Sequence, residues 1–129
     1  MIVLDASVVV ELLLNRPVAE LLRRDLAGGE PILAPHLLDV EVTSALRKMI
    51  GGRRLDGHRG KMLLAGLASL PVERYAHTPV LERIWELRHN FTCYDAAYIA
   101  LAEATDSVLY TMDAKLRSGH RARVRVLGQ

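Results

Sequence analysis

The chain has 129 residues, half of them apolar and a quarter charged, a composition that excludes extended disorder and suits one compact domain over residues 1–129. Its single cysteine, Cys93, excludes an intrachain disulfide and a zinc site built from cysteines, and we expect it to be a small buried side chain. The longest uncharged segment, residues 62–72, is too short to span a bilayer, and the charge at Asp5 argues against a signal peptide. We therefore expect a soluble, cytoplasmic protein with no membrane partner.

The net charge is only +2, but the cations gather in two segments. Residues 47–61 hold six Lys or Arg and one acid, and the residues after Asp113 hold five cations and no acid. Each segment could be an ordinary solvated face, or it could contact the phosphates of a nucleic acid. The residues considered for RNA contact are Arg47, Lys48, Arg53, Arg54, Lys115 and Arg117.

Short apolar segments alternate with longer helical patterns along the chain. Strands are expected at residues 2–4, 31–34, from 71–72 onward, 108–111 and 124–127. Helices are expected at residues 8–14 (with Ser7 as the cap), 18–27, 37–50, 60–70, 78–89, 94–105 and 114–118. This alternation predicts an α/β fold in which helices cover both faces of a mostly parallel sheet of four to five short strands.

Four acids are candidates for a functional site, and two of them lie at the carboxyl ends of strands, where parallel sheets bind their ligands. Asp5 ends the first strand, Asp113 follows the fourth, and Asp95 lies in the first turn of an apolar helix. Glu41 lies on the long helix, about 80° from the centre of its apolar stripe, whereas Asp39 falls on the opposite side and should be solvated. Taken singly, Asp95 and Asp113 could be helix caps and Glu41 a surface ion pair. Asp5 needs compensation, because burying an unpaired carboxylate costs several kcal/mol.

Convergence of these acids would require a cation or protonation. Two carboxylates about 4 Å apart repel by about 4 kcal/mol at an effective dielectric near 20. Ligands that are all oxygen select a hard ion, Mg²⁺, with Mn²⁺ as a possible substitute. Such an ion can activate water for attack on a phosphodiester while basic residues hold the flanking phosphates.

At these residues the chain resembles the PIN-domain family and, within it, the VapC-type toxins of prokaryotic toxin–antitoxin pairs. The matching segments, which occur in the family's order and spacing, are Val3-Leu4-Asp5-Ala6-Ser7, Glu41-Val42-Thr43-Ser44-Ala45-Leu46-Arg47, Tyr94-Asp95-Ala96-Ala97-Tyr98-Ile99-Ala100-Leu101-Ala102 and Thr111-Met112-Asp113. The resemblance implies a three-layer α/β/α fold and a Mg²⁺-dependent endoribonuclease. It assigns the catalytic metal ligands to Asp5, Glu41, Asp95 and Asp113, with Ser7 and Thr111 as polar groups behind them. It also implies a homodimer and neutralisation by a VapB-type antitoxin.

Two other functions stay open on the sequence alone. A catalytically inert RNA-binding or assembly module with the same fold would bind RNA without a divalent ion. A metal-dependent phosphatase would act on a small phosphoester, although Ser7 occupies the second position of the expected Asp-x-Asp pattern. Apolar residues on the first two helices belong to the core or form a groove for an antitoxin helix; they are Leu12, Leu13, Leu14, Val18, Leu21 and Leu22.

Overall fold

The computed structural model describes residues 1–128, so Gln129, the last residue of the expected domain, lies outside the described residues. The strands are β1 (Ile2–Leu4), β2 (Ile32–Pro35), β3 (Val72–Tyr75), β4 (Val108–Thr111) and β5 (Arg123–Val126). The α-helices are α1 (Ala6–Leu13), α2 (Pro17–Leu26), α3 (Leu37–Gly51), α4 (Gly57–Ser69), α5 (Leu81–Glu86) and α6 (Cys93–Ala104). Two 3₁₀ helices are η1 (Thr78–Val80) and η2 (Ala114–Arg117). No helix within residues 1–128 is long and apolar enough to cross a membrane.

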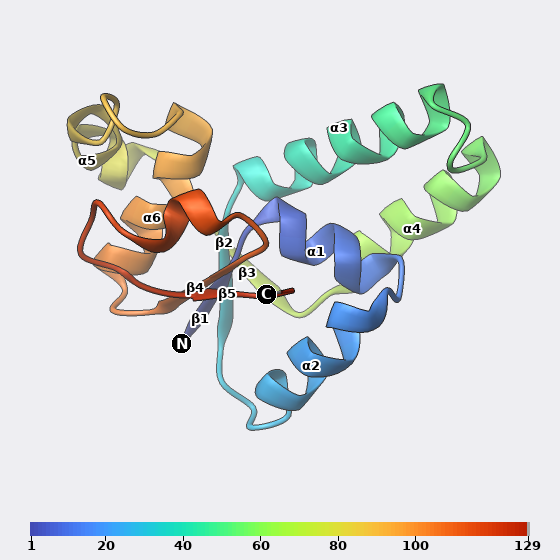
Figure 1. The fold of residues 1–129 in the computed structure, drawn as a ribbon, viewed down its shortest axis with the longest axis horizontal. Helices are drawn as coiled ribbons and strands as arrows, with labels where there is room; N and C mark the ends of the chain where they lie inside the picture. Colours follow the sequence, from blue (N-terminus) through green and yellow to red (C-terminus); the bar gives the residue numbers. More distant parts are fainter. Residues whose placement is uncertain (129) are drawn as a thin grey trace.

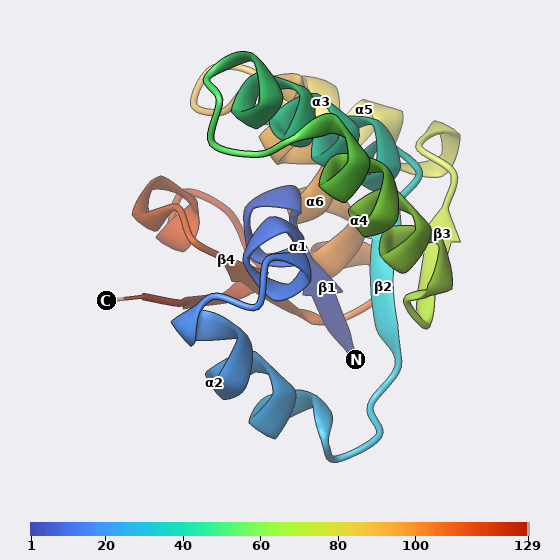
Figure 2. The same ribbon diagram turned by 90° about the vertical axis from the view of Figure 1, so that its right-hand side faces the viewer.

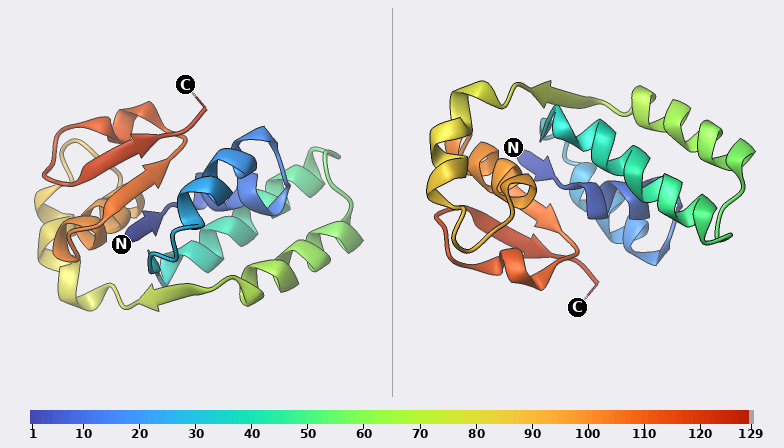
Figure 3. Two further views of the ribbon diagram at one scale, coloured as in Figure 1. Left: turned by 90° about the horizontal axis from the view of Figure 1, so that it is seen from below. Right: turned by 90° about the horizontal axis from the view of Figure 1, so that it is seen from above.

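The sheet is entirely parallel, with the strand order β3-β2-β1-β4-β5 (Figure 1). Seen from below, α5 and α6 lie on one side of the sheet and α1 to α4 on the other (Figure 3). This arrangement confirms the three-layer α/β/α prediction. Since the central strand β1 pairs with β2 on one side and β4 on the other, the direction of winding changes beside the carboxyl end of β1.

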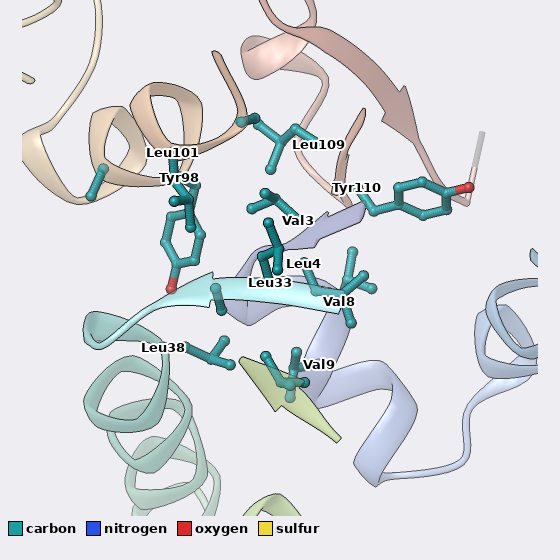
Figure 4. Close-up of a cluster of buried hydrophobic side chains, with 14 of the residues drawn as sticks. Val3, Leu4, Val8, Val9, Leu33, Leu38, Tyr98, Leu101, Leu109 and Tyr110 are labelled. Carbon is teal, nitrogen blue, oxygen red and sulfur yellow. The ribbon is translucent and has the colours of Figure 1, made fainter. Parts of the chain in front are cut away.

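The core forms around the central strands and α6. All three residues of β1 are buried, and Val3, Leu33 and Leu109 from three adjacent strands have no exposed surface (Figure 4). Helix α6 is buried over the seven consecutive residues Ala96–Ala102, as expected for a helix with apolar residues on every side. Its packing against β1, β2 and β4 places the first turn of α6 at the carboxyl end of the sheet.

Helices α3 and α4 form an antiparallel hairpin that extends away from the sheet (Figures 1 and 2). The hairpin is anchored at its base by Asp39, whose side chain is 44% exposed, in line with the expectation that it is solvated. Asp39 also has a partner that was not expected: Arg74 of β3 donates to both of its carboxylate oxygens, at 2.9 and 3.2 Å. The same guanidinium donates to the backbone carbonyls of Leu67 and Val72, so one side chain connects α3, α4 and β3.

Several helix boundaries differ from the predictions. Helix α1 begins at Ala6, and its cap is Asp5 rather than Ser7: the Asp5 backbone is extended and its carboxylate accepts the N–H of Val8 at 3.2 Å. Helix α4 begins three residues earlier than predicted, because Asp56 caps it. The predicted helix 78–89 is the short η1 followed by α5, which ends at Glu86. Cys93 is exposed, since it is the first residue of α6 and precedes the buried part of that helix.

Candidate active site

Asp5 is the most deeply buried acid at the carboxyl end of the sheet, with 6% of its surface exposed. Its backbone N–H donates to the carbonyl of Tyr110 on β4 at 3.2 Å, which continues the pairing of β1 with β4 beyond the last strand residue. Its carboxylate accepts from the Ser7 hydroxyl at 2.5 Å and from the Val8 N–H. The end of β1 therefore holds this carboxylate in one orientation.

Burial raises the pKa of Asp5 above its ordinary value. Hydrogen bonds from Ser7, Thr111 and Val8 act in the opposite direction, and the negative charge of Asp95 raises the pKa further. Asp5 is thus a carboxylate with too little solvation for its charge and a second acid close enough to repel it. Both features favour binding of a cation.

Asp95 and Asp113 form the next part of the acidic cluster. Asp95 lies in the first turn of α6, where its N–H donates to the Thr92 hydroxyl at 3.1 Å. Burial raises the pKa of Asp95, and the charge of Asp113 raises it further. Asp113 follows β4 and caps η2 by accepting the Lys115 N–H at 2.9 Å, while the Lys115 ammonium lies 3.9 Å from its carboxylate. The charge of Asp113 therefore raises the pKa of Asp95, and the charge of Asp95 raises the pKa of Asp5.

Ser7 and Thr111 connect the segments that carry these acids. The Ser7 hydroxyl donates to Asp5 and accepts the N–H of Met112, at 3.0 Å. Thr111 has no exposed surface, and its hydroxyl accepts the N–H of Asp113, at 3.0 Å. Two hydroxyls thus bridge the end of β1 and the end of β4.

Glu41 lies on α3 and is held by a residue that the sequence interpretation missed. The hydroxyl of Tyr98 on α6 donates to a Glu41 carboxylate oxygen at 2.6 Å. Burial raises the pKa of Tyr98, and the hydrogen bond and charge of Glu41, followed by the charge of Asp5, raise it further. Figure 4 shows Tyr98 reaching from α6 toward the carboxyl end of β2, which leads into α3. The available signal was the spacing of Asp95 and Tyr98, which lie three residues apart on one helix.

The cations predicted to contact RNA are only partly brought together. Lys48 lines a cleft of about 640 Å³ between α1 and α3 that also contains Ser7 and Glu41. Arg53 and Arg54 line a neighbouring cleft at the far end of α3. Lys115 lies beside Asp113, whereas Arg47 and Arg117 are exposed. Arg16 lines both clefts and was not expected at the site.

The donor set fits a hydrated Mg²⁺ better than a fully ligated ion. Within residues 1–128, no three Asp, Glu, His or Cys side chains are close enough together, as they stand, to hold one metal ion. Mg²⁺ retains several waters and is usually held by one or two carboxylates together with substrate phosphates. The buried Asp5 and the adjacent Asp95 supply hard oxygen donors and a local excess of negative charge, which suits this mode of binding.

The family model of the PIN domain matches residues 2–120, a range that includes the acids at the carboxyl end of β1, after β4 and in the first turn of α6. The chain belongs to the PIN-domain family. It is 39% identical to Ribonuclease VapC12 of Mycobacterium tuberculosis, over 98% of this chain and 99% of that protein. It is 41% identical to VapC ribonuclease Mb0985 of Mycobacterium bovis, over 95% of this chain and 94% of that protein.

The fold is also similar to the crystal structure of VapBC2 from Rickettsia felis bound to a DNA fragment from their promoter. The TM-score is 0.77 with 15% sequence identity, over 98% of this chain and 99% of that chain. At this identity the likeness supports the fold alone. The predicted family resemblance is confirmed by the family model and by the curated relatives.

Proposed function

We propose that this protein is a divalent-metal-dependent endoribonuclease and the toxin of a VapBC-type pair. The observation that carries the proposal is the buried carboxylate of Asp5. It lies at the carboxyl end of β1, where the direction of winding of the sheet changes, and Asp95 is close enough to raise its pKa. The relatives named ribonucleases cover nearly the whole chain, which supports RNA as the substrate. Such a cluster of acids suits phosphodiester hydrolysis, because a divalent cation held there would neutralise negative charge on a phosphate.

Of the four acids expected as ligands, Asp5 and Asp95 would hold a hydrated Mg²⁺ or Mn²⁺, and Asp113 and Glu41 would add negative charge around it. The ion, when bound, neutralises charge on the phosphate and makes water more acidic. The protein's own contribution is orientation: Ser7 and Thr111 fix the two strand ends, and Tyr98 fixes Glu41. Ser7 and Thr111 do not have the arrangement of a serine or threonine nucleophile beside a general base. The side chains of the site would therefore bind the ion and orient one another, without forming a covalent intermediate with the substrate.

The proposal includes a VapB-type antitoxin and a homodimer. A mostly apolar cleft of about 290 Å³ lies between helices α1 and α2 and strands β1 to β3. It is a suitable place for an apolar antitoxin segment. Its lining includes Leu12, Leu26, Ile32 and Val72. A partner protein that covers this cleft would protect apolar surface and add to the stability of the toxin.

Cleavage of RNA by purified variants tests the proposed activity. Asp5→Asn and Asp95→Asn should each reduce cleavage at least 100-fold in the presence of Mg²⁺, and EDTA should have the same effect on the wild type. The matched control is Asp106→Asn, which removes an acid whose side chain is 97% exposed and which lies just before the start of β4. Asp106 has a positive φ of 51°, a conformation that Asn tolerates, so this control should fold and cleave normally.

The outcomes separate the proposal from its alternatives. Full cleavage by both Asn variants would overturn the assignment of the active site. RNA binding that persists in EDTA, with no cleavage under any metal condition, would identify an inert RNA-binding module. Hydrolysis of a chromogenic phosphomonoester in place of RNA would identify a phosphatase. Sequencing the 5′ ends of transcripts after induction of the toxin would identify the RNA target.

A further inference from the structure

The cleft between α1 and α3 runs from the acids toward the distal end of the α3–α4 hairpin. Ser7 and Glu41 lie at one end of it, and Lys48 and Arg16 lie further along. Lys48 follows Glu41 by seven residues, about 20° short of two full turns, so the two side chains share one face of α3 about 10 Å apart along its axis. The cleft therefore has a carboxylate, that of Glu41, near the strand ends, whereas further along it has two cations, Lys48 and Arg16, and one acid, Glu11, which pairs with Arg16.

A second cleft adjoins the first at Arg16. Its volume is about 490 Å³, and it lies between the end of α1 and the turn that joins α3 to α4. Its charged lining consists of four guanidinium groups, from Arg16, Arg53, Arg54 and Arg59, and one carboxylate, from Asp56. We refer to these four arginines and the space between them as the arginine cleft.

The arginine cleft holds more cations than counterions, because the Asp56 carboxylate is the one acid in its lining. Arg16 pairs with Glu11 at 3.1 Å, but across the 128 described residues Arg53, Arg54 and Arg59 make no ion pair. Asp56 already accepts the backbone N–H of Arg59 as the cap of α4. Four cations with one acid in the same lining are an excess of positive charge, which repels itself in the free protein and attracts an anion.

Arg53 gives independent support, because its backbone conformation is unfavourable for arginine. It follows the C-cap of α3 with a φ of 59°, and the N–H groups of Arg53 and Arg54 donate to the carbonyls of Ile50 and Met49. This is the Schellman arrangement, in which the left-handed position is usually glycine. Folding therefore favours glycine at position 53, so the arginine adds a cation to the lining of the cleft at some cost to the fold.

We propose that the arginine cleft binds backbone phosphates of the RNA strand on one side of the scissile bond, and that the α1–α3 cleft carries the strand from there to the acids. This inference rests on the proposed ribonuclease function. The acids by themselves repel RNA, so a nuclease of this kind needs cations at a distance to hold the substrate. Guanidinium groups suit this role, because their planar donors match phosphate oxygens in a two-point contact.

Binding of fluorescein-labelled oligouridylates tests the proposal. Oligomers of about 4 and about 16 nucleotides span the range of known single-strand site sizes, and EDTA prevents cleavage during the titration. The variant carries Arg53→Gly, Arg54→Gln and Arg59→Gln together. The matched control is Arg24→Gln, since Arg24 is an exposed cation at the end of α2 that lines neither cleft.

The triple variant should bind the longer oligomer about 10- to 100-fold more weakly at low salt and leave binding of the shorter one nearly unchanged. The slope of log K against log salt should fall by about 2, because each lost phosphate contact on a single strand removes about 0.7. In cleavage assays KM for long RNA should rise while kcat stays within about two-fold. Arg53→Gly alone should leave the melting temperature unchanged or raise it.

Each outcome decides the proposal. Wild-type affinity and salt slope in the triple variant, with wild-type protein that binds and cleaves RNA, would overturn the arginine cleft while leaving the ribonuclease intact. Wild-type protein that neither binds nor cleaves RNA would instead overturn the proposed function. If an oligoglutamate peptide binds the wild type but not the triple variant, and RNA binds both equally, the cleft takes an acidic protein segment and the RNA proposal is wrong.

Discussion

Tyr98 shows how one buried hydroxyl can organise the candidate active site. Its side chain is 1% exposed, and its O–H has the Glu41 carboxylate as partner at 2.6 Å. Because burial and the adjacent acids raise its pKa, the phenol stays protonated and remains a donor. Glu41 is thereby held on the side of α3 that faces the other acids. Tyr98 is a positioning residue, since it acts through Glu41.

Removing only this hydroxyl should weaken metal binding while keeping the fold. Tyr98→Phe should raise the Mg²⁺ concentration needed for half-maximal RNA cleavage by about 10-fold, the usual effect of losing a group that orients a metal ligand. The cost in stability should be about 1 kcal/mol. The matched control is Tyr110→Phe, which removes a hydroxyl bonded to Asp25 at 2.7 Å. An unchanged Mg²⁺ dependence in Tyr98→Phe would show that Glu41 needs no support.

Glu103 is a second acid with a defined role, which is structural. Its side chain is 7% exposed; Arg83 donates to both of its oxygens at 2.7 and 3.0 Å, and the Arg121 N–H donates at 2.8 Å. Burial alone would raise the pKa of Glu103, but these hydrogen bonds and the charges of Arg83 and Arg121 hold it below the ordinary value. The interaction ties α5 and the segment before β5 to the end of α6.

The lowered pKa of Glu103 predicts how stability depends on pH. A carboxyl with a lower pKa in the folded state stabilises the fold above its unfolded pKa, about 4.3, and this contribution is lost as the pH falls through the folded value. Glu103→Gln should cost about 1–3 kcal/mol at pH 7, measured by urea unfolding. The difference from wild type should shrink below pH 4. Glu86→Gln, at an exposed acid 4.0 Å from Arg83, should change stability little at either pH. A Glu103→Gln cost that is the same at pH 7 and pH 3 would contradict this explanation.

At the scale of elements, the sequence predicted the helices and strands well where the signal was local. The apolar segments of β1 and β4 and the apolar helix α6 are close to their expected bounds. The predicted start of α1 was wrong because two neighbouring residues, Asp5 and Ser7, are both good helix caps. The backbone of Asp5 is extended, as a cap requires, so the helix begins after Asp5. The start of α4 was obscured by Gly57 and Gly60, because glycine lowers helix propensity.

For the candidate site, the sequence indicated the acids but not the residues that hydrogen-bond to them. The acids could be proposed as site residues because strand ends and a helix start are visible in the sequence. Their partners could not, since Tyr98 reaches Glu41 across 57 residues and Arg74 reaches Asp39 across 35. Arg16 gave no signal, because its position beside the α3–α4 turn depends on how α1 packs against α3. Contacts between elements that are distant in the chain require the fold itself.

The α4 cap offers a prediction that separates stability from binding. Asp56 caps α4 through the Arg59 N–H at 2.8 Å, and its carboxylate also lines the arginine cleft. Asp56→Asn keeps a good cap and removes the negative charge, so RNA binding should tighten about 2- to 5-fold with little change in melting temperature. Asp56→Ala removes the cap as well and should cost about 1 kcal/mol in urea unfolding. Weaker RNA binding by Asp56→Asn would contradict the proposed role of the cleft.

At the scale of the whole molecule, the fold places the acids and most of the arginines of two adjoining clefts at opposite ends. The acids lie at the carboxyl end of the sheet, and the unpaired arginines lie at the end of a hairpin that extends from it. Neither group stabilises the free protein, because each holds like charges near one another. Residues that serve the proposed function therefore lower the stability of the free protein. A bound cation at the acids and a bound phosphate at the arginines would neutralise this repulsion and stabilise the fold.

This opposition predicts that the protein without metal becomes more stable when its central acid is neutralised. Asp5→Asn removes the buried charge, while an asparagine oxygen can still accept the Ser7 hydroxyl and the Val8 N–H that begins α1. In EDTA the variant should be more stable than wild type by about 0.5–2 kcal/mol, measured by urea unfolding. Saturating Mg²⁺ at about 100 times Kd should stabilise the wild type by about 2.7 kcal/mol, and the variant should lose most of this response.

The matched control for Asp5→Asn is Asp106→Asn, which tests whether the stability changes are specific to the acidic cluster. Asp106→Asn changes the same functional group at an exposed position, so it should match wild type both in EDTA and in Mg²⁺. An Asp5→Asn protein that is less stable than wild type in EDTA would mean that the Asp5 charge supports the fold. An undiminished response to Mg²⁺ would place the ion elsewhere on the molecule. The expected pair of results, higher stability without metal and a lost response to it, follows only if burial and the neighbouring Asp95 strain the Asp5 carboxylate until a cation binds.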